Sequence, residues 1–113
     1  MTLKTIEQIA SKRISDSKRS AKKKKIKHTL KNEDIIRMHI QSGGKCPITG
    51  NNFILDTGNL MVPSLDRFNS KKGYTPDNCW LISWAANRAK GEMEWDEFKN
   101  FIKSSNKNME SYV

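Results

Sequence analysis

Residues 63–90 contain the side chains of this chain that could do chemistry together. The acidic and basic pair Asp66-Arg67 is followed by a loop rich in Gly, Pro, Asn and Lys, and then by Asp77-Asn78 and Asn87. Hydrolysis of a phosphodiester requires stabilisation of the charge on the nonbridging and leaving oxygens, and a divalent cation held by few protein ligands supplies it. One carboxylate and one amide oxygen, as Asp66 and Asn87 would supply, suit Mg²⁺, which keeps several waters and is rarely held by protein ligands alone.

The order and spacing of these residues resemble the HNH endonuclease family, also called ββα-metal or His-Me finger nucleases. In that family an Asp-His pair ends the first strand of a hairpin, an Asn opens the second strand, and a further Asn or His lies on the following helix. The resemblance covers about residues 45–101. It implies that Asp66 binds the metal, that Arg67 stands at the position of the general-base His, that Asn78 is the hairpin Asn, and that Asn87 is the helical metal ligand.

Several consequences follow from the resemblance. The expected substrate is DNA and the expected cofactor is Mg²⁺, with Mn²⁺ as an alternative. The phrases Ser-Leu-Asp-Arg, Gly-Tyr-Thr-Pro-Asp-Asn and Asn-Arg-Ala-Lys-Gly look like a phage-type branch of HNH-like proteins that carries Asp-Arg. A phage-encoded protein of this kind would act in the cytoplasm of a bacterial host.

Arg67 departs from the family pattern, because a guanidinium stays protonated and cannot take a proton from water. It can instead bind a phosphate bidentately. The base of a DNA-cleaving reaction could then be metal-bound hydroxide, a substrate phosphate oxygen, or one of the two histidines, His28 and His39. His28 reads as a solvated residue of a basic run, and His39 as a helical residue near the core.

Two other functions fit the same residues. The chain could be a DNA-binding protein that keeps the HNH fold and has lost catalysis, with Arg67 as the inactivating replacement, or it could bind an acidic partner without metal. Each fragment also has a purely structural interpretation: Asp66-Arg67 as an ion-paired turn, Asp77-Asn78 as turn residues after a proline, and Asn87-Arg88 as a polar helix face. The ordered set favours the HNH-like fold.

The positive charge is confined to the N-terminal segment. Residues 1–31 hold eleven Lys and Arg and two acids, which accounts for the whole net charge of +9, and residues 32–113 are neutral. A localised basic segment binds a polyanion by releasing condensed counterions. The expected nucleic-acid contacts are Lys22, Lys23, Lys24, Lys25, Lys27, Arg88 and Lys90.

The elements that must position these residues give an α+β fold class: a small ββα-metal (HNH-like) core with flanking helices and a basic N-terminal helical arm. The arm is residues 1–31, with an amphipathic helix followed by a lysine run that orders on phosphate. The HNH-like domain is residues 32–103, and residues 104–113 form a flexible tail.

Within the domain we predict helices over 32–44, 84–90 and 92–103, strands over 64–68 and 79–82, and strand-like pieces at 53–55 and 60–62. Ser83 would cap the middle helix and Gly91 would end it.

Cysteine usage argues against a structural zinc ion. Many HNH proteins carry a zinc knuckle of two Cys-x-x-Cys pairs, and the corresponding positions here are Cys46, Thr49, Ser83 and Ala86. With Cys79 there are two thiols in all, too few for that site, and both are expected to be free and buried. No membrane-spanning run is evident, and the state in solution is expected to be a monomer or a homodimer.

Overall fold

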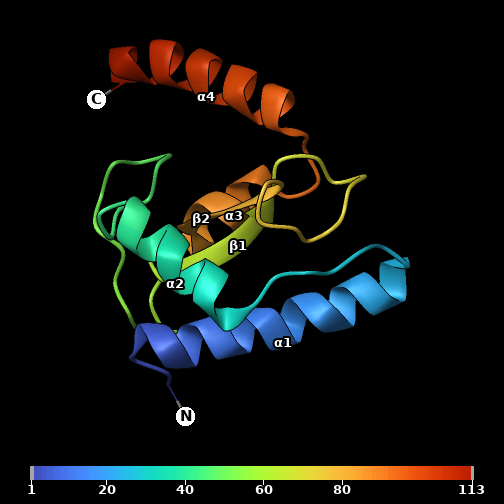
Figure 1. Cartoon of the computed structure of the whole chain (residues 1–113). Coiled ribbons are helices and arrows are strands. Elements are labelled where there is room, and N and C mark those ends of the chain that lie inside the picture. Colours follow the sequence, from blue (N-terminus) through green and yellow to red (C-terminus); the bar gives the residue numbers. More distant parts are fainter. Residues whose placement is uncertain (1, 113) are drawn as a thin grey trace.

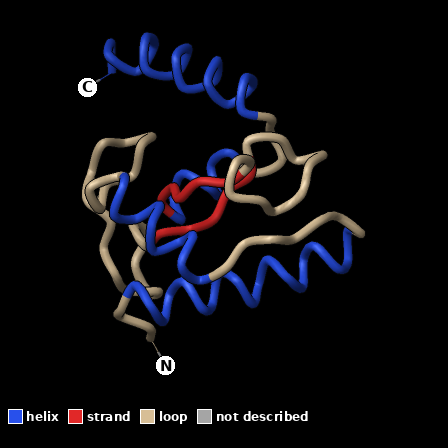
Figure 2. The backbone as a smooth tube through the Cα atoms, in the orientation of Figure 1, coloured by secondary structure: helices blue, strands red, loops and turns tan. Residues whose placement is uncertain are grey.

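A two-stranded antiparallel hairpin lies at the centre of the computed structural model, which describes residues 2–112. Strand β1 (Pro63–Arg67) pairs with β2 (Cys79–Ser83), and the register places Asp66 opposite Trp80. Helices surround the sheet, as Figure 2 shows, and most residues of both strands are buried. This is why the apolar run of β2 shows no clean alternation of polar and apolar residues.

Helix α3 (Trp84–Lys90) follows β2 without a loop. The Ser83 hydroxyl accepts the Ala86 backbone N–H at 3.1 Å, and Gly91 ends the helix with φ at +54°. Both boundary residues were predicted from the sequence, and both are confirmed. The helix packs on the two strands, so that the chain runs strand, strand, helix within residues 63–90.

The basic N-terminal segment packs against the hairpin. Helix α1 (Ile6–Lys24) buries Ile9, Ala10 and Ile14, and the Arg13 Nε donates to the Pro63 carbonyl at 3.0 Å. Figure 1 shows α1 lying along one side of the domain, where it contacts both β1 and α2 (Asn32–Gln41), and α2 packs on β2. The lysine run expected to order only on phosphate is helical as far as Lys24, because the apolar side of the same helix is held by the core.

The hairpin loop, residues 68–78, rests on the segment that leaves α1. The Tyr74 backbone N–H donates to the Lys27 carbonyl at 2.8 Å, and the Thr29 N–H donates back to the Tyr74 carbonyl at 2.9 Å. Gly73 lies so close to this segment that an added Cβ would be 2.3 Å from the Lys27 carbonyl oxygen. The loop is therefore positioned by residues from the N-terminal segment.

The last helix is longer than the sequence predicted. Helix α4 (Trp95–Met109) continues beyond the expected end at residue 103, and a 3₁₀ turn, η1 (Glu110–Tyr112), follows it. The tail expected to be flexible, residues 104–113, is therefore helical over 104–112, and residue 113 lies outside the described residues. Its first turn is anchored where the Trp95 ring meets Trp80 edge to face, with centroids 4.9 Å apart, and where Phe98 is buried. The rest of α4 stands away from the hairpin (Figure 1).

Two further observations complete the fold. Residues 53–55 and 60–62, predicted as strand-like pieces, form irregular structure held by bonds such as Ile54 N–H to the Met61 carbonyl at 3.1 Å. None of the helices in residues 2–112 has the length and apolar character needed to cross a membrane.

Gly73→Ala is expected to destabilise the protein by about 1–3 kcal/mol, because the new methyl group must push the loop off the Lys27 backbone. Urea unfolding followed by tryptophan fluorescence measures this. Lys72→Ala, at an exposed position of the same loop, is the matched control and should leave the midpoint almost unchanged. Equal midpoints for the two variants would show that the loop does not rest on Lys27.

Candidate functional site

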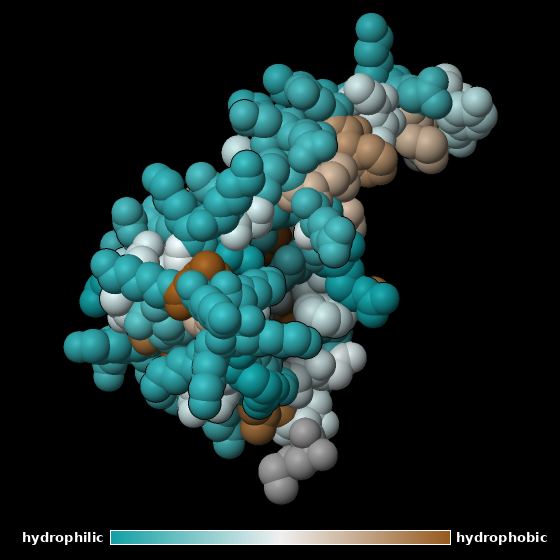
Figure 3. Space-filling model, turned by 90° about the vertical axis from the view of Figure 1, so that its right-hand side faces the viewer, coloured by the Kyte–Doolittle hydropathy of each residue, from teal (hydrophilic) through white to brown (hydrophobic). Residues whose placement is uncertain are grey.

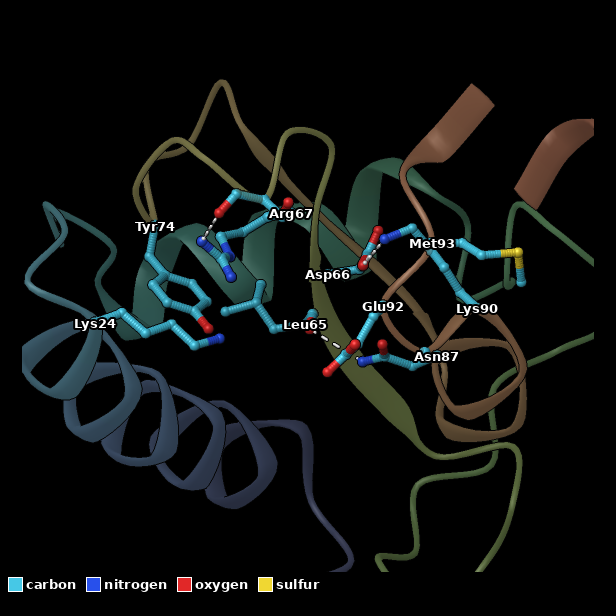
Figure 4. Close-up of a pocket in the computed structure, with 11 residues that line it drawn as sticks. Lys24, Leu65, Asp66, Arg67, Tyr74, Asn87, Lys90, Glu92 and Met93 are labelled. Carbon is cyan, nitrogen blue, oxygen red and sulfur yellow. Dashed lines mark hydrogen bonds and ion pairs between the residues drawn. The ribbon is translucent and has the colours of Figure 1, made fainter. Parts of the chain in front are cut away.

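A cavity of about 500 Å³ opens between the end of β1, the hairpin loop, the end of α1 and the segment after α3. We call it the hairpin cavity. Figure 4 shows its lining, which includes Asp66 and Arg67 from β1, Asn87 and Lys90 from α3, and Lys24 from α1. The cavity therefore brings together an acid, an amide and three basic side chains from three separate elements.

Asp66 is buried with both carboxylate oxygens bonded. Its Oδ1 lies 3.0 Å from the Lys90 ammonium, and its Oδ2 accepts the Trp80 indole N–H at 2.9 Å. Residues directly opposite in an antiparallel pair share a face of the sheet, which explains why Trp80 reaches Asp66. Asp66 and Lys90 are only 7% and 5% exposed. The carboxylate expected to bind metal is thus neutralised by a lysine.

Asn87 is fixed in orientation by β1. Its amide nitrogen donates to the Ser64 hydroxyl at 2.8 Å and to the Leu65 carbonyl at 3.2 Å. Asn87 and Lys90 lie three residues apart on α3, so both side chains face the same strand. With the nitrogen committed to β1, the oxygen Oδ1 is the atom that Asn87 can offer to a cation in the cavity.

Arg67 braces the hairpin loop. Its Nη1 donates to the Ser70 carbonyl at 2.7 Å and the Lys72 carbonyl at 3.0 Å, and its guanidinium lies 4.7 Å from the centre of the Tyr74 ring. A guanidinium has five N–H donors, so these two bonds leave others for an anion. Arg67 lines the cavity and holds its loop wall at the same time.

Asn78 holds the loop closed. Its Oδ1 accepts the Asn69 N–H at 3.1 Å, and its Nδ2 donates to the carbonyls of Asn69 and Gly73 at 3.0 and 2.9 Å. The side chain is buried and is absent from the cavity lining. Asn78 therefore shapes the loop wall of the cavity. The other three expected catalytic residues, Asp66, Arg67 and Asn87, line the cavity itself.

The expected nucleic-acid contacts fall into three groups. Lys22, Lys23, Lys25 and Lys27 are exposed, and Lys24 lines the hairpin cavity. Arg88 is exposed, with its guanidinium 5.6 Å from the centre of the Trp84 ring, which is itself 38% exposed. Lys90 differs from the expectation, since its ammonium is buried on Asp66 and is unavailable to a phosphate in this arrangement.

Neither histidine lines the hairpin cavity. His28 is not a solvated residue: its Nε2 lies 2.8 Å from the Ser17 hydroxyl, and burial followed by the nearby Lys18 lowers its pKa. His39 stacks on Phe53 with ring centroids 6.0 Å apart, and burial lowers its pKa. A proton acceptor in the cavity must therefore be another group.

The two cysteines are free and buried. Burial raises the pKa of the Cys46 thiol, but hydrogen bonds from Ser83, Thr49 and Ile48 outweigh this effect and lower it overall. Burial raises the pKa of Cys79 to about 12. Cys46 and Ser83 come from the two segments compared with a zinc knuckle, and they touch, since the Ser83 backbone N–H lies 3.3 Å from the Cys46 sulfur.

The donor atoms of the hairpin cavity fit a hard divalent cation in type. Asp66 supplies a carboxylate, Asn87 an amide oxygen, and Glu92, also in the lining, a second carboxylate. Residues 2–112 contain no group of three or more His, Cys, Asp and Glu placed to hold a metal, so most ligands of such an ion would be waters. Lys90 must leave Asp66 Oδ1 before that oxygen can bind it.

Sequence reasoning did not select six residues of the cavity lining, of which Tyr74 and Glu92 bear most on its chemistry; the others are Leu65, Ser70, Gly91 and Met93. The turn at Gly91 returns Glu92 to the cavity, and that glycine is the signal that could have found it. Tyr74 carries no comparable signal, because its placement depends on the contact between the loop and the segment after α1.

Comparison with protein-family models, curated proteins and solved structures finds no match to this chain.

Asp66→Asn is expected to destabilise the protein by about 3–5 kcal/mol, because it leaves the Lys90 ammonium buried without a counter-charge. The double variant Asp66→Asn/Lys90→Gln removes both charges and should recover most of that loss. Urea unfolding of the wild type, both single variants and the double variant measures the coupling. Additive losses in the double variant would contradict a direct ion pair.

Proposed function

We propose that this protein is a metal-dependent endonuclease of the HNH type that hydrolyses phosphodiester bonds in DNA. The observation that carries the proposal is the convergence of Asp66 from β1 and Asn87 from α3 on one cavity that Lys24 and Arg67 also line. The strand, strand, helix order of residues 63–90 is the order that the resemblance implies. The contact between Cys46 and Ser83 adds support, because a zinc-braced relative would bring its two ligand pairs together at those positions.

Asp66 and Asn87 Oδ1 would hold Mg²⁺, or Mn²⁺ in its place. The bound ion supplies charge stabilisation to the nonbridging and leaving oxygens of the phosphate. Because the Lys90 ammonium occupies Asp66 Oδ1, metal binding must release Lys90. A released ammonium would remain in the same cavity, where a substrate phosphate is its natural partner.

We assign phosphate binding and proton transfer to the other polar residues of the hairpin cavity. Arg67 and Lys24 offer donors to a phosphate, and Arg67 does so from a position fixed by the loop carbonyls. Glu92 is exposed and is the carboxylate of the lining that is not paired with Lys90, so it is the side chain best placed to take a proton from water. A substrate phosphate oxygen is the alternative proton acceptor.

The exposed lysines would guide DNA to the cavity. Lys22, Lys23 and Lys25 surround Lys24 at the end of α1, and Lys27 follows in the segment that supports the hairpin loop. Since Lys24 itself lines the cavity, a backbone bound along these residues would lie beside Arg67 and Asp66. The binding charge and the candidate chemical site are therefore neighbours.

One observation favours a second candidate function. The ion pair between Asp66 and Lys90 satisfies the carboxylate without metal, and Arg67 is engaged with the hairpin loop. A protein that retained this arrangement when bound to DNA would be a catalytically inactive DNA-binding protein with an HNH-type fold. The two candidates differ in whether the backbone is cut.

Wild-type protein is expected to nick supercoiled plasmid in Mg²⁺ or Mn²⁺ and to leave it intact in EDTA. Asn87→Ala and Asp66→Asn/Lys90→Gln should lower the nicking rate by roughly a hundredfold or more, since each removes a donor to the ion that stabilises the transition state. Glu92→Gln should lower it by about a hundredfold while DNA binding is retained.

The matched controls are Asn100→Ala and Glu33→Gln, which are exposed and lie on other helices. Both should nick like the wild type. Plasmid that is retarded on the gel but intact in every lane, with all proteins folded by circular dichroism, would contradict the nuclease and establish the inactive DNA-binding protein.

Replacing Lys22, Lys23 and Lys25 together by Gln is expected to weaken DNA binding and to flatten its dependence on salt. Each lost phosphate contact should lower the slope of log K against log salt by about 0.9. Fluorescence anisotropy with labelled duplex across a salt series measures the slope. Gln at Lys99, Lys103 and Lys107 of α4 removes the same charge elsewhere, and equal effects of both triple variants would contradict a binding surface at the end of α1.

A further inference from the structure

The hairpin cavity continues into a second depression that the function proposed above does not use. This depression has a volume of about 220 Å³ and shares Leu65 and Tyr74 with the lining of the hairpin cavity. Its lining also includes Trp84, the first residue of α3. The two depressions follow the edge of β1 that has no strand beside it among residues 2–112, and we call them together the edge groove.

Two helices form the walls of the edge groove, since α1 and α3 both contact β1. Residues of α1 spaced by three and four line it, and residues of α3 spaced by three line the other side. The α1 wall holds Arg13, Ser17, Ser20 and Lys24, and the α3 wall holds Trp84, Asn87 and Lys90. The two depressions, of about 500 and 220 Å³, have the size of pockets that enclose a single small ligand. Such a groove admits individual nucleotides, and a double helix would have to lie outside it.

The second depression has a polar lining that suits a nucleotide. Three serine hydroxyls, each a donor and an acceptor, line it: Ser17, Ser20 and Ser64. The carboxylate in the lining, Asp16, lies 3.3 Å from the Lys12 ammonium and 3.6 Å from the Arg19 guanidinium, so cations of α1 offset its charge. Figure 3 shows the face on which α1 ends and the hairpin loop lies, and this face is mainly hydrophilic. These features favour a polar, anionic occupant over an apolar one.

Trp84 is the feature that points to an unpaired base. It is 38% exposed, whereas Trp80 and Trp95 pack on each other edge to face. The Arg88 guanidinium, one turn further along α3, lies 5.6 Å from the centre of the Trp84 ring. An exposed ring beside a cation can stack on a base while the cation binds a phosphate. Because both faces of a base inside a duplex are already stacked on its neighbours, this arrangement selects unpaired bases.

We propose that the edge groove binds an unpaired segment of DNA, with one base stacked on Trp84 and its phosphates held by Arg88 and Lys24. The proposal rests on the proposed function in taking DNA as the substrate, and it adds that the nucleotides beside the candidate metal site are unpaired. Trp84 and Asn87 are separated by about 4.5 Å of helix rise, so the stacked base lies next to a candidate metal ligand. Supercoiled plasmid meets this requirement because negative supercoiling favours local opening of the duplex.

Fluorescence anisotropy in EDTA tests the proposal without cleavage, on a labelled single strand and a labelled duplex of equal length. Trp84→Ala should weaken single-strand binding about tenfold, because a stacked base is lost, and should change duplex binding less than about twofold. Trp84→Phe keeps an aromatic ring and should retain most of the single-strand affinity. Phe101→Ala, which removes an exposed ring from α4, is the matched control and should bind like the wild type. Circular dichroism checks that all variants fold.

A salt series separates stacking from charge. Trp84→Ala should lower the single-strand affinity by the same factor at every salt concentration, which leaves the slope of log K against log salt unchanged. Arg88→Gln should reduce that slope by about 0.7, the value for one lost phosphate contact on a single strand. Lys99→Gln, on the exposed side of α4, removes the same charge away from the groove and should leave the slope as it is.

Three results would overturn the proposal: single-strand affinity of Trp84→Ala equal to that of the wild type, equal losses on single strand and duplex, or a wild type that binds duplex and no single strand. The last of these would leave the proposed endonuclease intact. Conversely, single-strand binding that depends on Trp84, in a protein that never nicks plasmid, would support the edge groove and reject the endonuclease.

Discussion

The structure is organised by the need to neutralise one buried carboxylate. Asp66 lies inside the hairpin, where an unpaired charge would be costly, and its two oxygens are satisfied by Lys90 from α3 and Trp80 from β2. These contacts fix the helix and the second strand relative to β1. Trp80 also receives Trp95, so the start of α4 is held through the same residue. A cation in contact with Asp66 is therefore a structural requirement, and the functional question is whether a divalent ion can replace the lysine.

The loop wall of the cavity depends on contacts that are distant in sequence. Asn78 closes the loop from within, Arg67 binds its carbonyls, and the segment after α1 supports it through Tyr74. The N-terminal residues thus have two tasks that the charge pattern alone does not distinguish. Their apolar side stabilises the fold, and Lys24 at the end of α1 reaches the candidate site. Loss of this helix would be expected to disturb the cavity as well as to remove the cluster of basic side chains.

Local signals in the sequence were sufficient for the central elements. The hairpin and α3 were predictable because Ser83, Gly91 and the apolar run of β2 act on adjacent residues. The convergence of Asp66 and Asn87 on a single cavity agrees with their expected roles, which remain a proposal. The burial of Lys90 was not predictable, because a lysine on a short helix is expected to be exposed unless the position of its partner, here Asp66, is known. The length of α4 was underestimated because Ser104, Ser105 and Asn106 are weak helix formers that here continue a helix already begun.

The central claim is that the hairpin cavity exchanges Lys90 for a divalent ion on Asp66, and diffraction from crystals soaked in Mn²⁺, collected near the manganese absorption edge, tests it most directly. The account predicts an anomalous peak about 2 Å from the Asp66 carboxylate and Asn87 Oδ1, with the Lys90 ammonium displaced from Asp66. An intact contact between Lys90 and Asp66, with no peak in the cavity, would contradict it.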